Sequence, residues 1–67
     1  MIDVGDKVKW TGEVENGNYP MPDWLTTDMV GTVEVVDEEE KYVYGVWFET
    51  DEGSEYEVFA EGELIRA

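Results

Sequence analysis

Two β-rich runs separated by a charged turn dominate the sequence between residues 31 and 50. The first run contains three valines, and the second combines tyrosines, valines, a tryptophan and a phenylalanine. Branched and aromatic side chains suit a pleated, half-buried strand. The intervening Asp-Glu-Glu-Glu-Lys segment, residues 37–41, is a polar break that joins two such runs, so the stretch predicts a hairpin.

Alternation along this hairpin assigns its side chains to two faces, because successive residues of a strand point to opposite sides. The predicted core face carries Val33, Val35, Tyr42, Tyr44, Val46 and Phe48. The predicted outer face carries Glu34, Val36, Val43, Gly45, Trp47 and Glu49. A tryptophan pointing away from the core is either covered by a loop or terminus, or it is an exposed anchor for a partner.

The segment before the hairpin divides into a short strand and a long loop. Residues 3–11 predict a turn followed by a strand with Val8 and Trp10 facing the core. Residues 12–30 lack alternation and contain an Asn-Gly pair and two prolines, which favour turns. Long irregular loops are often functional.

Two hypotheses describe the aromatic residues of this loop. Trp24 and Leu25 fold back to cap one open end of the core, or Tyr19 and Trp24 together grip a partner.

The segment after the hairpin predicts a tight turn at 51–53, where Gly53 supplies positive φ. A fourth strand follows over residues 54–59. Its alternation predicts Tyr56 and Val58 inside, and places on the outer side Glu55, Glu57 and Phe59.

Residues 60–63 are predicted to form a single helical turn before a short closing strand. A length of 67 residues predicts one domain over residues 1–67, with a core of ten side chains. That core comprises Val8, Trp10, Val33, Val35, Tyr44, Val46, Phe48, Tyr56, Val58 and Leu64.

Four segments carry a family resemblance: Val4-Gly5-Asp6-Lys7-Val8, Gly31-Thr32-Val33, Tyr44-x-Val46-x-Phe48 and Glu63-Leu64. They resemble the small SH3-like barrel, in the variants related to KOW domains and similar single-domain bacterial or phage proteins. The resemblance implies an all-β, five-stranded SH3-like barrel with a long loop between strands 1 and 2 and a short helical turn before the last strand. Such barrels host many functions. Their RNA-binding members use basic loops, whereas the loops here are acidic.

The composition points away from catalysis. The chain has no histidine and no cysteine, and its one serine, Ser54, lies in a hairpin turn without a partner base. The commonest general base and the thiol nucleophile are therefore missing. The acids at 37–40 do not match the spacing of a calcium loop. We expect a non-enzymatic protein without cofactor or metal site.

The charge is the strongest functional indication. Eighteen acidic and four basic residues give a formal net charge of −14. This charge repels nucleic acid and anionic lipid and speeds encounters with basic partners. The chain also lacks a long apolar run and a signal-peptide pattern at its start. We therefore expect a cytoplasmic protein, monomeric or weakly dimeric, that binds neither nucleic acid nor membrane.

Two hypotheses of function follow. The first is a protein-binding module for a basic protein or basic peptide segment. A sharper version is a phage-type DNA mimic that blocks a host nucleic-acid-binding protein. The expected partner-binding residues are Trp47, Glu34, Val43, Glu49, Glu55 and Glu57, with Tyr19 and Trp24 as a second edge. The alternative is a soluble SH3-like domain whose acidity serves solubility or salt adaptation.

Overall fold

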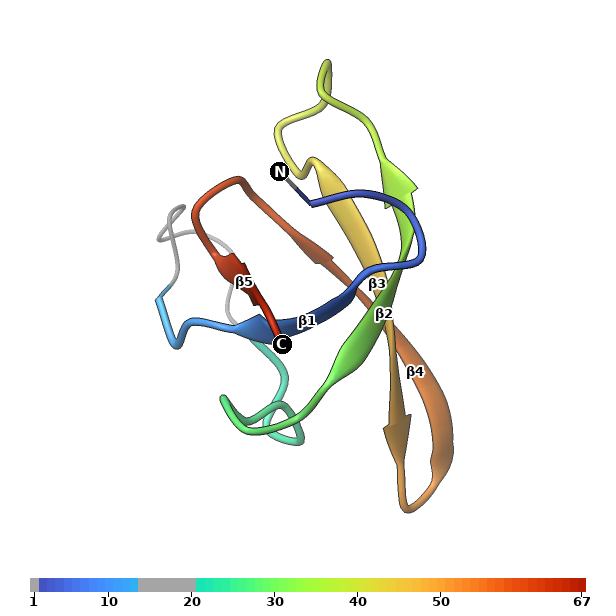
Figure 1. Cartoon of the computed structure of the whole chain (residues 1–67). Helices are drawn as coiled ribbons and strands as arrows, with labels where there is room; N and C mark the ends of the chain where they lie inside the picture. The colour runs from blue at the N-terminus through green and yellow to red at the C-terminus, as the bar shows by residue number, and fades with distance from the viewer. Residues whose placement is uncertain (1, 14–20) are drawn as a thin grey trace.

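The computed structural model describes residues 2–13 and 21–67, which contain five strands. These are β1 (Lys7–Trp10), β2 (Gly31–Val36), β3 (Tyr44–Thr50), β4 (Gly53–Phe59) and β5 (Leu64–Arg66). They form one antiparallel sheet in the order β4-β3-β2-β1-β5 (Figure 1). The predicted all-β fold with five strands is confirmed.

Two finer expectations are not met within the described residues. β4 and β5 lie at opposite edges of the sheet and do not pair, so the sheet is open and no closed barrel is formed. Residues 60–63 form a turn in place of the predicted helical turn, with the Glu63 N–H donating to the Ala60 carbonyl over 3.2 Å. Gly62 has a φ of +95°, which a right-handed helix does not use.

A β-bulge in β2 changes the predicted face of Val35. Val33 pairs with Val46 and is 1 % exposed, whereas Val35 pairs with Gly45 and is 42 % exposed. The register shifts between Val33 and Val35, because Glu34 is an extra residue there. The prediction of Val35 as a core residue was wrong, since simple alternation does not continue through a bulge.

The register of β4 reverses the predicted faces of that strand. Thr50 pairs with Gly53 across a two-residue turn, and the register then places Tyr56 opposite Trp47. Directly opposed residues of an antiparallel pair share a face, so Tyr56 lies on the outer side with Trp47. Phe59 is fully buried, and Glu57 is 8 % exposed on the inner side. The strand begins one residue earlier than its sequence pattern indicates.

The core occupies the inner side of the sheet. Its buried apolar members are Val8, Leu25, Val33, Val43, Tyr44, Val46, Phe48, Phe59 and Leu64. Val43, expected on the outer face, precedes β3, and its carbonyl accepts the Asp37 N–H over 2.8 Å. That bond closes the 37–43 turn outside the strand, so strand alternation does not extend to Val43, and its side chain enters the core.

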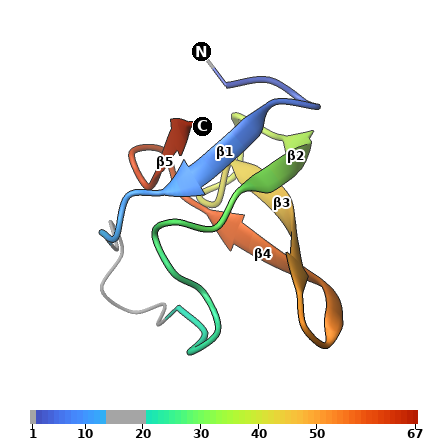
Figure 2. The same cartoon turned by 60° about the horizontal axis from the view of Figure 1, so that its bottom comes forward.

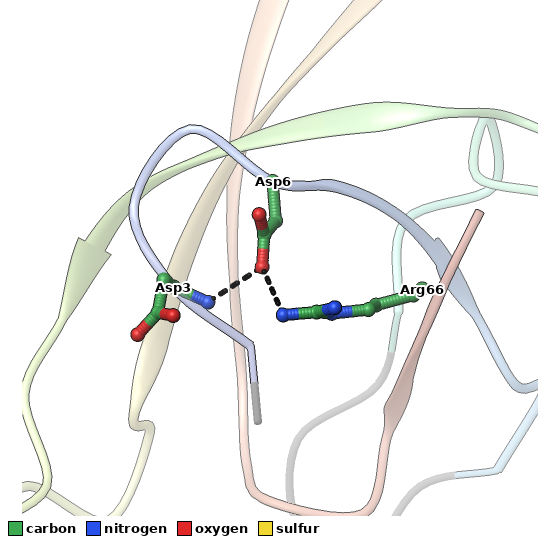
Figure 3. Close-up of polar contacts among 3 residues, drawn as sticks. All are labelled: Asp3, Asp6 and Arg66. Atoms are coloured by element: carbon green, nitrogen blue, oxygen red, sulfur yellow. Dashed lines mark hydrogen bonds and ion pairs between the residues drawn. The ribbon is translucent and has the colours of Figure 1, made fainter.

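Hydrogen bonds and one ion pair tie the beginning of the chain to its end. The Asp6 carboxylate accepts the Asp3 N–H over 2.8 Å and pairs with the Arg66 guanidinium at 3.1 Å (Figure 3). The N–H of Gly5 donates to the Val33 carbonyl over 2.7 Å. These contacts fix β1 between β2 and β5, far along the sheet from β4.

Candidate functional site

The structure separates the residues that the sequence predicts to form one partner-binding surface. Trp47 lies on the outer face and is 40 % exposed, which confirms its predicted direction. Its ring packs against Tyr56, with centroids 5.0 Å apart and planes at 60°. A Cβ added at Gly45 would collide with the Tyr56 hydroxyl. The space that Gly45 leaves on the outer face is therefore filled by Tyr56, which also packs against the Trp47 indole.

The acidic rim expected around Trp47 is weaker than predicted. Glu55 and Glu57 belong to the inner side, because Phe48 and Val46 are their cross-strand neighbours. Thr32 pairs with Trp47, and its hydroxyl accepts a 2.7 Å hydrogen bond from the Lys7 ammonium. The Lys7 ammonium thus lies beside Thr32, the cross-strand neighbour of Trp47. This positive charge makes the outer face less suited to a basic partner.

Two other members of the predicted surface are buried and do not join Trp47. Val43 and Glu57 are buried at 7 % and 8 % exposure. Glu34 is exposed at the β2 bulge. Tyr19 lies outside the described residues, so the predicted grip by Tyr19 and Trp24 stays a prediction.

A cleft at the end of the β3–β4 hairpin brings together Trp24, Glu49 and Glu55 from the predicted set. This hairpin cleft has a volume of about 450 Å³. It is lined by Trp24, Thr26, Met29, Glu49, Thr50, Asp51, Glu52 and Glu55. Four of these described residues are acidic and none is basic, so the cleft combines an apolar wall with a strongly negative rim.

Packing against the core positions the apolar wall. Leu25 is buried at 5 % exposure, and its N–H donates to the Pro22 carbonyl over 3.1 Å in a tight turn. The Trp24 ring meets the edge of Phe48, with centroids 5.8 Å apart and planes at 62°. The hypothesis that Trp24 and Leu25 cap the core is confirmed. Trp24 is only partly buried and also lines the cleft.

Side-chain hydrogen bonds fix the acidic wall. The Thr50 hydroxyl donates to the Gly53 carbonyl over 2.8 Å and accepts the Glu52 N–H over 3.2 Å. The Ser54 hydroxyl donates to the Glu49 carboxylate over 3.0 Å. Gly53 has a φ of +121°, a conformation that side chains rarely adopt. These bonds hold the backbone of the turn and the Glu49 carboxylate in place before any ligand arrives.

A further carboxylate lies next to the cleft. The hydroxyl of Thr26, a lining residue, donates to the Asp28 carboxylate and holds the pKa of Asp28 below its ordinary value of 3.8. The charged form of Asp28 is therefore favoured at neutral pH. Its charge, which interacts with the Lys9 ammonium, adds to the negative field of the four lining carboxylates.

The arrangement suits an organic cation. Two opposite unit charges 4 Å apart attract by about 1 kcal/mol in water and about 4 kcal/mol at the effective dielectric of a protein surface. Aromatic rings also attract a cation placed over their faces. In the described part of the chain, no group of three or more acidic side chains is arranged to hold a metal ion.

Sequence reasoning missed the contributions of Met29, Asp51 and Glu52 to this cleft. The sequence predicted a turn at residues 51–53. Because turns lie at the surface, it could also have predicted that the two acidic side chains of this turn are exposed. Nothing in the local pattern shows that residues 24–29 pack beside that turn, since the two segments are far apart in sequence. The packing of Trp24 on Phe48 and the burial of Leu25 in the core bring them together.

Comparisons with known proteins found no significant match. No protein-family model, no curated protein and no solved structure resembles the chain closely enough to assign it to a family. In the two described segments, no helix has the length and apolar character needed to cross a membrane.

Proposed function

We propose that the protein is a small, non-enzymatic binding module that engages a basic protein or peptide through the hairpin cleft. The observation that carries this proposal is the cleft itself. It joins an accessible tryptophan and a methionine to four carboxylates, without a lysine or arginine among the described lining residues. Its volume of about 450 Å³ falls within the range typical of ligand pockets.

An arginine side chain fits this chemistry better than other natural cations. Its planar guanidinium can stack on the Trp24 ring while its N–H groups donate to a carboxylate on the same side of the hairpin, such as Glu55. Its methylene stem can lie against the Met29 thioether, because long basic side chains pack their apolar stems on apolar surface. The overall charge of −14 would speed the encounter.

The experiment compares two variants with the same net charge. Asp51→Lys/Glu52→Lys reverses charge at the cleft, and Glu38→Lys/Glu39→Lys reverses charge in the distant 37–41 turn. Each replaces two carboxylates by two ammonium groups, and so raises the formal charge by four, from −14 to −10. All four positions are exposed, so both variants should fold.

Binding of a fluorescent arginine-rich peptide is measured by anisotropy at low and physiological salt. We expect the cleft variant to bind roughly tenfold more weakly, a loss of about 1.4 kcal/mol. The control variant should lose much less, because surface charges more than a Debye length away are largely screened. Equal losses in both variants would contradict recognition in the cleft.

Mimicry of nucleic acid is a second version of the same proposal. A phosphate mimic would present carboxylates over a whole face, so both variants should then lose affinity for a basic nucleic-acid-binding protein alike. Acidity that serves only solubility or salt adaptation predicts no peptide binding in either variant. Four carboxylates line the same cleft as Trp24. This local concentration favours recognition in the cleft over nucleic-acid mimicry and over acidity that serves only solubility.

We also propose that the fold is a member of the SH3-like class with an open sheet. The support is topological: β1 pairs with both β2 and the C-terminal β5, while β2, β3 and β4 form a meander. An experimental structure in which the edges of β4 and β5 approach each other would strengthen this grouping.

A further inference from the structure

β4 is an edge strand that offers main-chain hydrogen-bonding groups beside the hairpin cleft. It lies at one end of the sheet order, and no described strand pairs with its outer edge. In an antiparallel ladder, alternate residues turn their N–H and C=O groups away from the neighbouring strand. Because Thr50 and Gly53 close the turn, this alternation directs the main-chain groups of Ser54, Tyr56 and Val58 outward.

The edge lacks three of the features that block pairing with another chain. Natural edge strands are commonly protected by proline, lysine or a bulge. β4 contains neither proline nor lysine, and it pairs with β3 without a register shift. Residues 53–56 are exposed, and the end of the β3–β4 hairpin projects away from β1, β2 and β5 in both views (Figures 1 and 2).

The two faces of β4 differ in chemistry. On the outer side, Tyr56 is 39 % exposed and packs on Trp47, and Val58 follows on the same side. On the inner side, Glu55 lines the hairpin cleft. A strand added here would place alternate side chains beside an aromatic-aliphatic surface and beside an acidic cleft.

We infer that an extended partner segment with alternating basic and apolar residues pairs with the edge of β4. Its basic side chains lie on the side of Glu55, where the nearest enters the hairpin cleft. Its apolar side chains lie beside Tyr56 and Val58. Main-chain hydrogen bonds supply affinity, and the alternating side chains supply specificity, as in other cases of strand addition. This inference rests on the proposed function and adds its mode of recognition.

Charge complementarity favours a basic partner over a second copy of the chain. Pairing of β4 with β4 would place the glutamates of two copies on the same inner side. Like charges that face each other across strands are destabilising. The whole chain also carries −14, so two copies repel each other before contact.

The test uses a short peptide that alternates arginine and valine, in three forms. One form is unmodified, a second is N-methylated at the arginines, and a third is N-methylated at the valines. Side-chain direction and N–H direction alternate together along a strand. One methylated form therefore loses the N–H groups that face β4, and the other loses N–H groups that face solvent. The two forms share composition, charge and degree of methylation.

We expect the two methylated peptides to differ in dissociation constant by at least roughly tenfold, since several main-chain hydrogen bonds are lost in one of them. The weaker form identifies the strand direction. In hydrogen exchange of the complex, the amides of Ser54, Tyr56 and Val58 should become protected.

Each other outcome overturns a specific step. Equal affinities of the two methylated peptides, without new amide protection, contradict edge pairing and leave recognition in the cleft intact. Absence of binding by the unmodified peptide contradicts the proposed function itself. Concentration-dependent association of the protein alone, with protection of the same three amides, assigns the edge to a second copy.

Discussion

On the outer face of the β3–β4 hairpin, Trp47 packs against Tyr56 at 5.0 Å and shares its row with Lys7 and Thr32. At the hairpin end, Trp24 is held against Phe48 at 5.8 Å and faces carboxylates without a basic lining residue among those described. Both regions combine an accessible tryptophan with nearby polar groups. On the outer face, the Thr32 hydroxyl and the Lys7 ammonium bond to each other. In the cleft, by contrast, the carboxylates meet no cation among the described lining residues, so their negative charge can attract a ligand.

The difference teaches that exposure of an aromatic side chain is a weak indicator of a binding site. Trp47 is the more conspicuous residue in the sequence, because alternation predicts that it points outward. Trp24 lies in an irregular loop and was a secondary candidate. Concavity and unmatched charge distinguish the two, and both depend on tertiary packing.

The largest expected effect is on stability, and it compares a core residue beneath Trp24 with the exposed Trp47. Phe48 is fully buried and contacts the rings of both Trp24 and Phe59. We expect Phe48→Ala to destabilise the protein by about 3–5 kcal/mol, much of the stability of a domain this small. Trp47→Ala should cost far less, since the indole is 40 % exposed. Urea unfolding followed by circular dichroism measures both, and similar costs would contradict the separation of the two regions.

A smaller effect tests the packing of the outer face. Gly45→Ala places a methyl group where the Tyr56 hydroxyl lies, and we expect a loss of about 1–3 kcal/mol from the forced displacement. In a Tyr56→Ala background the same change should be nearly neutral. A double-mutant cycle measures this coupling. Additive costs would show that Tyr56 does not cover Gly45.

The smallest effect concerns the inner side of β3 and depends on pH. Burial raises the pKa of Tyr44 above its ordinary value of 10.0, and the carboxylates of Glu61, Glu38 and Asp3 raise it further. A raised folded-state pKa means that the folded protein holds the proton more tightly. The protonated Tyr44 hydroxyl therefore stabilises the folded state fully below pH 10, and this stabilisation is lost as the pH rises through the folded-state pKa of Tyr44.

Tyr44→Phe removes this titration. We expect the variant to lose less stability than the parent protein between neutral and strongly alkaline pH, as measured by urea unfolding at a series of pH values. Parallel alkaline losses in the parent and Tyr44→Phe proteins would contradict a role for Tyr44.

The strands themselves could be predicted because their alternation is strong and their turns are marked by glycine and acids. Several side-chain assignments failed for physical reasons, and those of Val35, Tyr56 and Phe59 show why. Val35 changes face at a bulge that no residue type announces. Tyr56 and Phe59 exchange faces because the turn contains two residues, and a shift of one residue reverses every side chain of a strand.

The candidate site was only partly predictable. The acids and Trp24 were recognised as separate features, and Glu49 and Glu55 were included for their charge. Their meeting depends on Leu25 entering the core, which fixes residues 24–29 beside the 51–52 turn. Contacts of this kind join segments distant in sequence, and a single sequence carries no local signal for them.

The most direct test of recognition in the cleft follows the three indole N–H signals by nuclear magnetic resonance during titration with the arginine-rich peptide. Trp24 reports on the hairpin cleft and Trp47 on the outer face. Trp10 is the reference, because its indole N–H donates to the Glu13 carbonyl over 2.9 Å. We expect the Trp24 signal to shift most and saturably, with much smaller changes at the other two. A larger saturable shift at Trp47 than at Trp24 would contradict the assignment of the binding site to the cleft.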